Sequence, residues 1–175
     1  MNSKTIPQRI VFIAALAAFA MILSYVEMLL PTTVLLPLPG FKMGLANIVT
    51  LLALTMLPFK DVLFVVLIRC SLMGLLFTGV IAFTLSLSGS LLALSVMWFL
   101  IHFRRHFSLV GISVVGACMH NVGQLTAVGF LTGTAAVAAY LPVLMITAAI
   151  TGTLVGFASM LAENTIKQNM SITSS

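Results

Sequence analysis

The chain consists mainly of long apolar runs, separated by short segments that carry charged or helix-breaking residues. A helix of about 20 apolar residues crosses the roughly 30 Å hydrocarbon core of a bilayer. The run from 62 to 101 is about twice that length, so we place a turn at Gly79. Six membrane-spanning segments are predicted in this way: 9–30, 43–57, 62–79, 80–101, 107–132 and 138–162. The pattern predicts an all-α integral membrane protein, a six-transmembrane-helix bundle in which residues 1–175 form one domain.

The segment between the first two predicted spans, residues 31–41, contains three prolines and one glycine. Proline fixes φ and lacks the amide hydrogen that a regular helix uses, so this segment is not expected to be helical. It is nevertheless mostly apolar. We predict an ordered loop that lies as a lid over one mouth of the bundle.

Hydrophobic residues make up 61% of the 175 residues and charged residues only 6%, against about 25% charged residues in soluble domains. This composition excludes a water-soluble surface. The net charge of +5 does not indicate nucleic-acid binding, because the basic residues lie singly or in pairs between apolar runs. Cys70 and Cys118 lie within apolar runs and lack metal-ligand spacing, so we expect neither a metal site nor a cofactor.

The distribution of basic residues predicts the orientation of the bundle. Lys and Arg are enriched in the cytoplasmic loops of membrane proteins. With the N-terminus inside, the residues on the cytoplasmic side are Lys4, Arg9, Lys60, Arg104, Arg105 and Lys167. Only Lys42 falls on the outer side. We therefore expect both termini to be cytoplasmic and the proline-rich loop to face outward.

Charged residues inside predicted spans are candidates for function, because a charge at mid-membrane costs roughly 2.5–3.5 kcal/mol on insertion scales. Arg69 lies in the third span with no acidic residue within reach on its own helix. It either snorkels or bonds carbonyls of a neighbouring helix, or it binds an anionic ligand. Glu27 and Lys42 lie near the outer interface, where they either form an ion pair that fixes the loop or contact a ligand.

The fifth predicted span carries His120 and Gln124 on one helix face, with Gly116 four residues earlier and Asn121 to one side. Small and hydrogen-bonding residues on one face suit either a neighbouring helix or a bound molecule. Asn47, in the second span, is expected at a similar depth. A polar pocket under the loop is therefore predicted, formed by Glu27, Lys42, Asn47, His120 and Gln124, with the neighbouring Asn121 as a further candidate for substrate contact.

The chain resembles a bacterial membrane family, the Gx transporters, in three places: residues 38–50 (Leu-Pro-Gly-Phe-Lys-Met-Gly-Leu-Ala-Asn-Ile-Val-Thr), Arg69, and residues 115–124 (Val-Gly-Ala-Cys-Met-His-Asn-Val-Gly-Gln). This family is also labelled heptaprenyl diphosphate synthase component I. Its helix pattern is similar to that of the substrate-binding S components of energy-coupling factor (ECF) transporters. The resemblance covers about residues 8–162.

The resemblance implies a bacterial cell membrane, contact with membrane lipid, and an outward-facing site capped by the first external loop. In S components a small-residue motif on the first helix docks on the ECF coupling subunit, and Ala14 and Ala18 match that motif. Without the resemblance, the same two alanines would indicate close helix packing within the bundle. The implied function is that of a substrate-binding subunit for uptake of a small, amphipathic molecule.

The chain has no P-loop sequence, so ATP-driven uptake would need separate ATPase and coupling subunits as partners. It also has one aspartate, Asp61, whereas prenyl chain elongation uses paired aspartate-rich motifs that hold magnesium and diphosphate. We therefore expect no catalytic residue in this chain. Two alternatives remain: an accessory membrane component of a two-part heptaprenyl diphosphate synthase, and a structural membrane partner of a redox or lipid-modifying complex.

Overall fold

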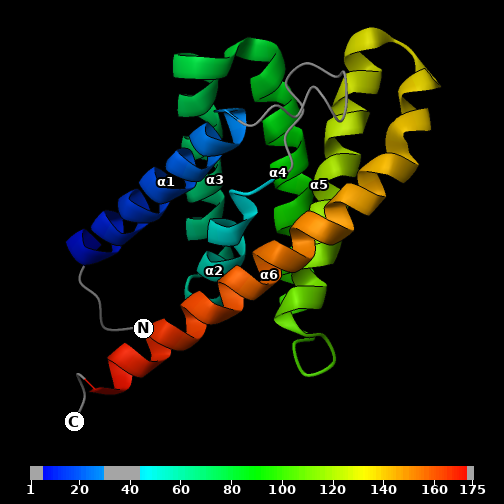
Figure 1. Ribbon diagram of the computed structural model, residues 1–175. Coiled ribbons are helices and arrows are strands. Elements are labelled where there is room, and N and C mark those ends of the chain that lie inside the picture. The colour runs from blue at the N-terminus through cyan, green and yellow to red at the C-terminus, as the bar shows by residue number, and fades with distance from the viewer. Residues whose placement is uncertain (1–5, 30–43, 173–175) are drawn as a thin grey trace.

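The computed structural model describes residues 6–29 and 44–172, except for the side chains of 166, 167 and 169–172 (Figure 1). All regular elements in these ranges are helical, as predicted, and no strand occurs among them. The elements are α1 (Ile6–Leu29), α2 (Asn47–Met56), α3 (Phe59–Met73), the π-helical turn η2 (Gly74–Thr78), α4 (Gly79–Ile101), α5 (Leu109–Thr132), the 3-10 turn η3 (Ala135–Tyr140) and α6 (Leu141–Ile172).

Four helical stretches of the described chain are long and apolar enough to cross a membrane: Ile6–Leu29, Phe59–Ile101, Leu109–Thr132 and Ala135–Thr165. The structure therefore supports a multi-pass membrane protein. The helix α2 has only 10 residues, which rise about 15 Å, half of the hydrocarbon core. It is thus shorter than the span predicted over 43–57, and the exact count of six crossings stays a prediction.

The longest stretch, Phe59–Ile101, reverses direction within its 43 residues. Arg69 in α3 donates to Ser90 Oγ in α4 at 2.5 Å, although a straight helix would separate two residues 21 positions apart by about 30 Å. The reversal follows η2 and lies at Gly79, whose φ of +76° is accessible mainly to glycine. The turn is therefore at the predicted residue, and α3 and α4 form an antiparallel pair.

The helices α4, α5 and α6 pack closely because glycines remove side chains at their crossing points. A Cβ atom on Gly123 of α5 would lie 2.8 Å from the Cα of Gly89 in α4. In α6, Cβ atoms on Gly152 and Gly156 would lie 2.7 and 2.6 Å from Cα atoms of α5. Such small residues allow helix backbones to approach each other in a membrane, where no hydrophobic driving force holds helices together.

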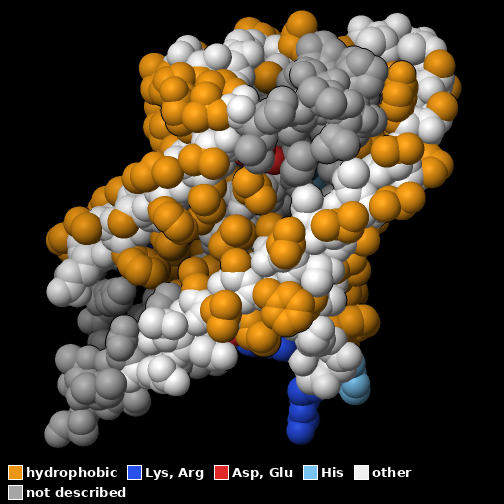
Figure 2. Space-filling model, viewed as in Figure 1, with side chains coloured by type: hydrophobic (Ala, Val, Ile, Leu, Met, Phe, Trp, Pro, Cys, Tyr) orange, Lys and Arg blue, Asp and Glu red, His pale blue; other side chains and the backbone are white. Residues whose placement is uncertain are grey.

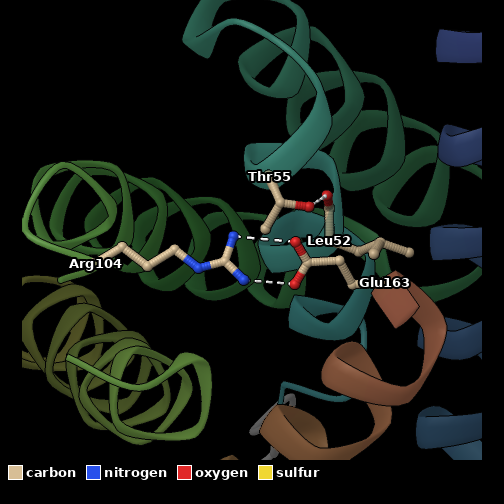
Figure 3. Close-up of polar contacts among 4 residues, drawn as sticks. All are labelled: Leu52, Thr55, Arg104 and Glu163. Atoms are coloured by element: carbon tan, nitrogen blue, oxygen red, sulfur yellow. Dashed lines mark hydrogen bonds and ion pairs between the residues drawn. The ribbon is translucent and has the colours of Figure 1, made fainter. Parts of the chain in front are cut away.

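Two bidentate ion pairs connect elements at one end of the bundle. Arg9 of α1 bonds both oxygens of Asp61 at the start of α3, at 2.7 and 2.6 Å. Arg104, in the turn between α4 and α5, bonds both oxygens of Glu163 of α6, at 3.0 and 2.6 Å (Figure 3). The basic residues Lys60 and Arg105 belong to the same end, beside these pairs.

The basic side chains visible in Figure 2 lie at this end, below a surface that is mostly hydrophobic. Large apolar side chains such as Leu75, Val80 and Phe130 are 79–86% exposed, as expected for a surface that contacts lipid. The predicted collection of basic residues on one side agrees with the fold for Arg9, Lys60, Arg104 and Arg105. Lys4 and the side chain of Lys167 lie outside the described parts, and which face is cytoplasmic stays a prediction.

Candidate functional site

Buried polar side chains from α1, α2, α3, α4 and α5 lie inside the bundle. Each is at most 4% exposed. We call this set the inner polar cluster; its members are Ser24, Glu27, Asn47, Arg69, Ser86, Ser90, His120 and Gln124. Five of them were predicted as site residues from the sequence. The three serines were not.

Gly44 joins three elements of the cluster. Its backbone N–H donates to Glu27 Oε1 of α1. A Cβ atom on Gly44 would lie 2.8 Å from Asn47 Nδ2 and 3.4 Å from His120 Cδ2. Its φ of +88° is also unfavourable for residues other than glycine. Glu27, Asn47 and His120 are therefore brought together around a position that has room for no side chain.

Asn47 is the first residue of α2 and is 3% exposed. Neither Nδ2 nor Oδ1 of its amide has a hydrogen-bond partner among the described residues. A buried polar group without a partner costs about 1–3 kcal/mol, and such groups are rare in folded proteins. The amide therefore offers one donor group and one acceptor to a molecule that enters the cluster.

His120 and Gln124 lie one turn apart on α5, with 2.9 Å between His120 Nε2 and Gln124 Nε2. This hydrogen bond joins the imidazole ring to the side-chain amide. Gly89 of α4 lies directly against both residues, since a Cβ atom there would be 3.0 Å from His120 Cε1 and Gln124 Cγ. The close approach of α4 and α5 thus fixes both side chains.

Arg69 connects α3 to two neighbouring helices. Its Nη1 donates to Ser24 Oγ of α1 at 3.0 Å, and its Nη2 donates to Ser90 Oγ of α4 at 2.5 Å. Snorkelling and bonds to backbone carbonyls were the structural roles expected for this residue. The side chain instead stays inside the bundle, 4% exposed, and its partners are hydroxyl groups.

Asn121 lies apart from the inner polar cluster. Its Nδ2 donates to the carbonyl oxygen of Leu144 in α6 at 2.8 Å, so the side chain contributes to the packing of α5 on α6. Lys42 lies outside the described residues, and the predicted Glu27–Lys42 pair is therefore not described either. Ala14 and Ala18 are exposed on α1, whereas Ala17 and Ala20 face the bundle. The predicted docking pair is thus free of packing within the described bundle.

The serines of the cluster gave a weak sequence signal, because serine is common in apolar helices. Ser86 and Ser90 are four residues apart and so share one face of α4, and Ser24 is one turn from Glu27. A search for hydroxyl partners of Arg69 could have found them. Among the described residues, no group of three His, Cys, Asp or Glu side chains could hold a metal ion.

Comparison with known families gives one match. The family model described as heptaprenyl diphosphate synthase component I matches residues 16–161. This region contains all members of the inner polar cluster, and it contains Ala18 but not Ala14. No curated protein and no solved structure matches the chain.

Proposed function

Because the chain belongs to the heptaprenyl diphosphate synthase component I family, and because its polar residues collect inside an apolar bundle, we propose that it is a membrane-embedded substrate-binding subunit. In this proposal it captures a small, amphipathic molecule and works with an ECF-type coupling subunit and separate ATPase subunits. The chain itself has no catalytic role. The inner polar cluster is the binding site.

The observation that carries the proposal is the buried, unpartnered amide of Asn47. A fold that buries this amide loses stability unless another molecule supplies its hydrogen bonds. Glu27 and His120 lie around the same position, Gln124 is hydrogen-bonded to His120, and these groups provide further polar contacts. A few polar groups within an apolar enclosure are typical of sites for small molecules.

The two ends of the bundle differ in a way that supports entry from one side. The ion pairs Arg9–Asp61 and Arg104–Glu163 hold elements together at the end where α3 and α5 begin. The inner polar cluster includes Glu27, near the end of α1, and Asn47, at the start of α2, both on the side away from these pairs. By the positive-inside rule, that side is the outer one.

The exposed alanines of α1 support the docking part of the proposal. Ala14 and Ala18 lie one turn apart on the exposed face of α1, and small residues at this spacing allow another helix to approach closely. A coupling subunit in the membrane would use such a face. The ATPase subunits would then contact the coupling subunit rather than this chain.

The family description favours a second candidate, an accessory subunit of a two-part heptaprenyl diphosphate synthase. In that case the partner chain would have to supply the carboxylates that hold magnesium and diphosphate. The only aspartate, Asp61, is bound by Arg9, and Glu163 is bound by Arg104. These two carboxylates are therefore engaged in holding the bundle.

The two candidates are separated by co-purification. The tagged protein is expressed in its host, purified in mild detergent, and its bound proteins are identified by mass spectrometry. Recovery of ATPase and coupling subunits would support the transport proposal. Recovery of a soluble prenyltransferase chain without ATPase subunits would refute it in favour of the accessory role.

The binding site is tested on the same preparations by extracting small molecules from wild type, Asn47→Ala and Asn164→Ala. Asn164 is an exposed asparagine of α6 and serves as the matched control. We expect a compound that is retained by wild type and Asn164→Ala and lost from Asn47→Ala. Equal retention by all three proteins would place the site elsewhere.

A further inference from the structure

Arg69 lies at the depth where a charge is most costly in a membrane. It is ten positions from Phe59, where α3 begins, and ten positions from the turn at Gly79. It is therefore about 15 Å from either end of the helical segment formed by α3 and η2, which corresponds to the middle of a hydrocarbon core of roughly 30 Å. Arginine stays protonated in proteins, so the fold cannot remove the charge by deprotonation.

No carboxylate neutralises Arg69 in the part of the chain that the structure describes. The chain has three acidic residues, and all three are described. Asp61 and Glu163 form their ion pairs with Arg9 and Arg104 at the end of the bundle. Glu27 accepts from Gly44 N and forms no ion pair with Arg69 among the described residues. The partners of Arg69 are two neutral hydroxyl groups.

Hydrogen-bond donors remain available around this charge. A guanidinium has five N–H groups, and Arg69 Nε has no partner among the described residues. Ser86 Oγ, one turn from Ser90 on the same face of α4, is also buried without a partner. The hydroxyl groups of Ser24 and Ser90 accept from Arg69 and can each donate their own hydrogen to a further acceptor. Arg69 is thus surrounded by hydroxyl groups and keeps donors for a further partner, and it forms no ion pair with a described carboxylate.

We infer that the molecule bound by this protein carries an anionic group, a carboxylate or a phosphate, that pairs with Arg69 and accepts hydrogen bonds from the neighbouring serine hydroxyls. The inference rests on the proposed function, since it assigns the charge of the substrate. The planar guanidinium matches both kinds of anion through two parallel hydrogen bonds. The ligand then supplies the ion-pair partner that Arg69 lacks among the described residues.

The test measures the melting temperature of the purified, full-length protein in detergent. Sodium phosphate, sodium diphosphate and sodium acetate are titrated against sodium chloride at constant ionic strength. We expect at least one of the three anions to raise the melting temperature above the chloride value with saturation. A response to phosphate or diphosphate identifies a phosphate group on the ligand, and a response to acetate alone identifies a carboxylate.

The variants are Arg69→Gln, Arg69→Lys and Arg105→Gln. Arg105→Gln removes the same charge from an exposed residue in the turn between α4 and α5 and should keep the wild-type response. Arg69→Gln should lose the response. Arg69→Lys keeps the charge but loses the planar fork, so its half-saturating concentration should rise at least about ten-fold. If Arg69→Gln does not fold, Arg69→Lys carries the comparison.

The inference is overturned if wild type shows no saturable response to the three anions, or if the Arg69 variants respond as wild type does. Failure of the proposed function gives a different result. If no extracted compound depends on Asn47 while the Arg69-dependent anion response persists, the anion site stands and the uptake role fails. If a compound depends on Asn47 and no anion response is found, the uptake role stands and the substrate has no anionic group at Arg69.

Discussion

Replacement of Gly123 by alanine tests how closely α4 and α5 must approach to form the site. A Cβ atom at residue 123 would lie 2.8 Å from both Gly89 Cα and Ser88 O, and these are backbone atoms that no rotamer change can move. Gly129, in the same helix, is the matched control, because its nearest neighbours would be 3.7 Å away, an ordinary contact distance. Both substitutions add one methyl group to a helical glycine.

The expected magnitude follows from two opposing terms. Alanine is favoured over glycine inside a helix by about 0.8–1.0 kcal/mol, and both variants gain this term. For Gly123→Ala, α4 and α5 must also separate by roughly half an ångström, and overpacking of this kind costs about 1–3 kcal/mol. Gly129→Ala should therefore be as stable as wild type or more stable, and Gly123→Ala should be about 1–3 kcal/mol less stable than Gly129→Ala.

The chain carries its own reporters for the assay, since Cys70 is buried and Cys118 is half-buried, and both are free thiols. A thiol-reactive fluorescent dye will label them as the bundle opens on heating. For a protein of this size, about 1 kcal/mol corresponds to 2–4 °C in melting temperature, so the two variants should differ by several degrees. A Gly123→Ala protein that melts at or above Gly129→Ala would refute the close packing of α4 on α5.

Three further predictions concern single contacts. Changing Ala14 and Ala18 together to leucine should prevent recovery of the coupling subunit in co-purification but leave ligand retention at the wild-type level. If the variant loses both the coupling subunit and the ligand, these alanines are part of the bundle core instead. Asn121→Ala should lower the melting temperature by the equivalent of about 1 kcal/mol, because the hydrogen bond from α5 to Leu144 O of α6 is lost, and it should leave ligand retention unchanged. A loss of ligand without a loss of stability would return Asn121 to the site. Glu163→Gln should lower the free energy of unfolding by about 1 kcal/mol at low salt and by less at high salt, because Arg104 is partly exposed and salt screens the ion pair. A loss of stability that does not depend on salt would contradict this.

The existence and approximate position of the long helices could be predicted because they depend on one dominant effect, although α6 runs to Ile172, ten residues past the predicted end at 162. An apolar run of about 20 residues is most stable as one helix that crosses the bilayer. The run that contains Gly79 is about twice this length, so it must reverse direction near its middle. The same effect identified Arg69 and Glu27 as candidate site residues, because a charged residue in such a run has a high free-energy cost in the bilayer and is therefore expected to have a structural or functional role. These residues are buried in the structure, as expected for groups that must avoid lipid.

The details of the site depend on contacts between distant residues, which the sequence does not specify. The start of α2 at Asn47 is set by the backbone of Gly44, with φ +88°, and by its bond to Glu27, 17 residues earlier. Asn121 was grouped with His120 because they are adjacent, but successive helical residues are rotated by about 100°, so Asn121 reaches α6 instead. Local patterns predict which residues are buried, but not which neighbour each one contacts.

The position of α1 suggests how binding and docking would be coupled under the proposed function. This helix carries Glu27 in the inner polar cluster and Ala14 and Ala18 on its exposed face, about 14–20 Å away along one uninterrupted helix. Besides packing, two polar side-chain contacts hold it to α3 in the described structure: the Arg9–Asp61 pair and the bond from Arg69 to Ser24. An anionic ligand that engages Arg69 would compete for or reorient the hydroxyl of Ser24, so it would act on one of those two contacts. Since a helix moves as a rigid element, a change at Ser24 would shift the docking face as well. Occupancy of the site would then be sensed by a coupling subunit that never touches the ligand.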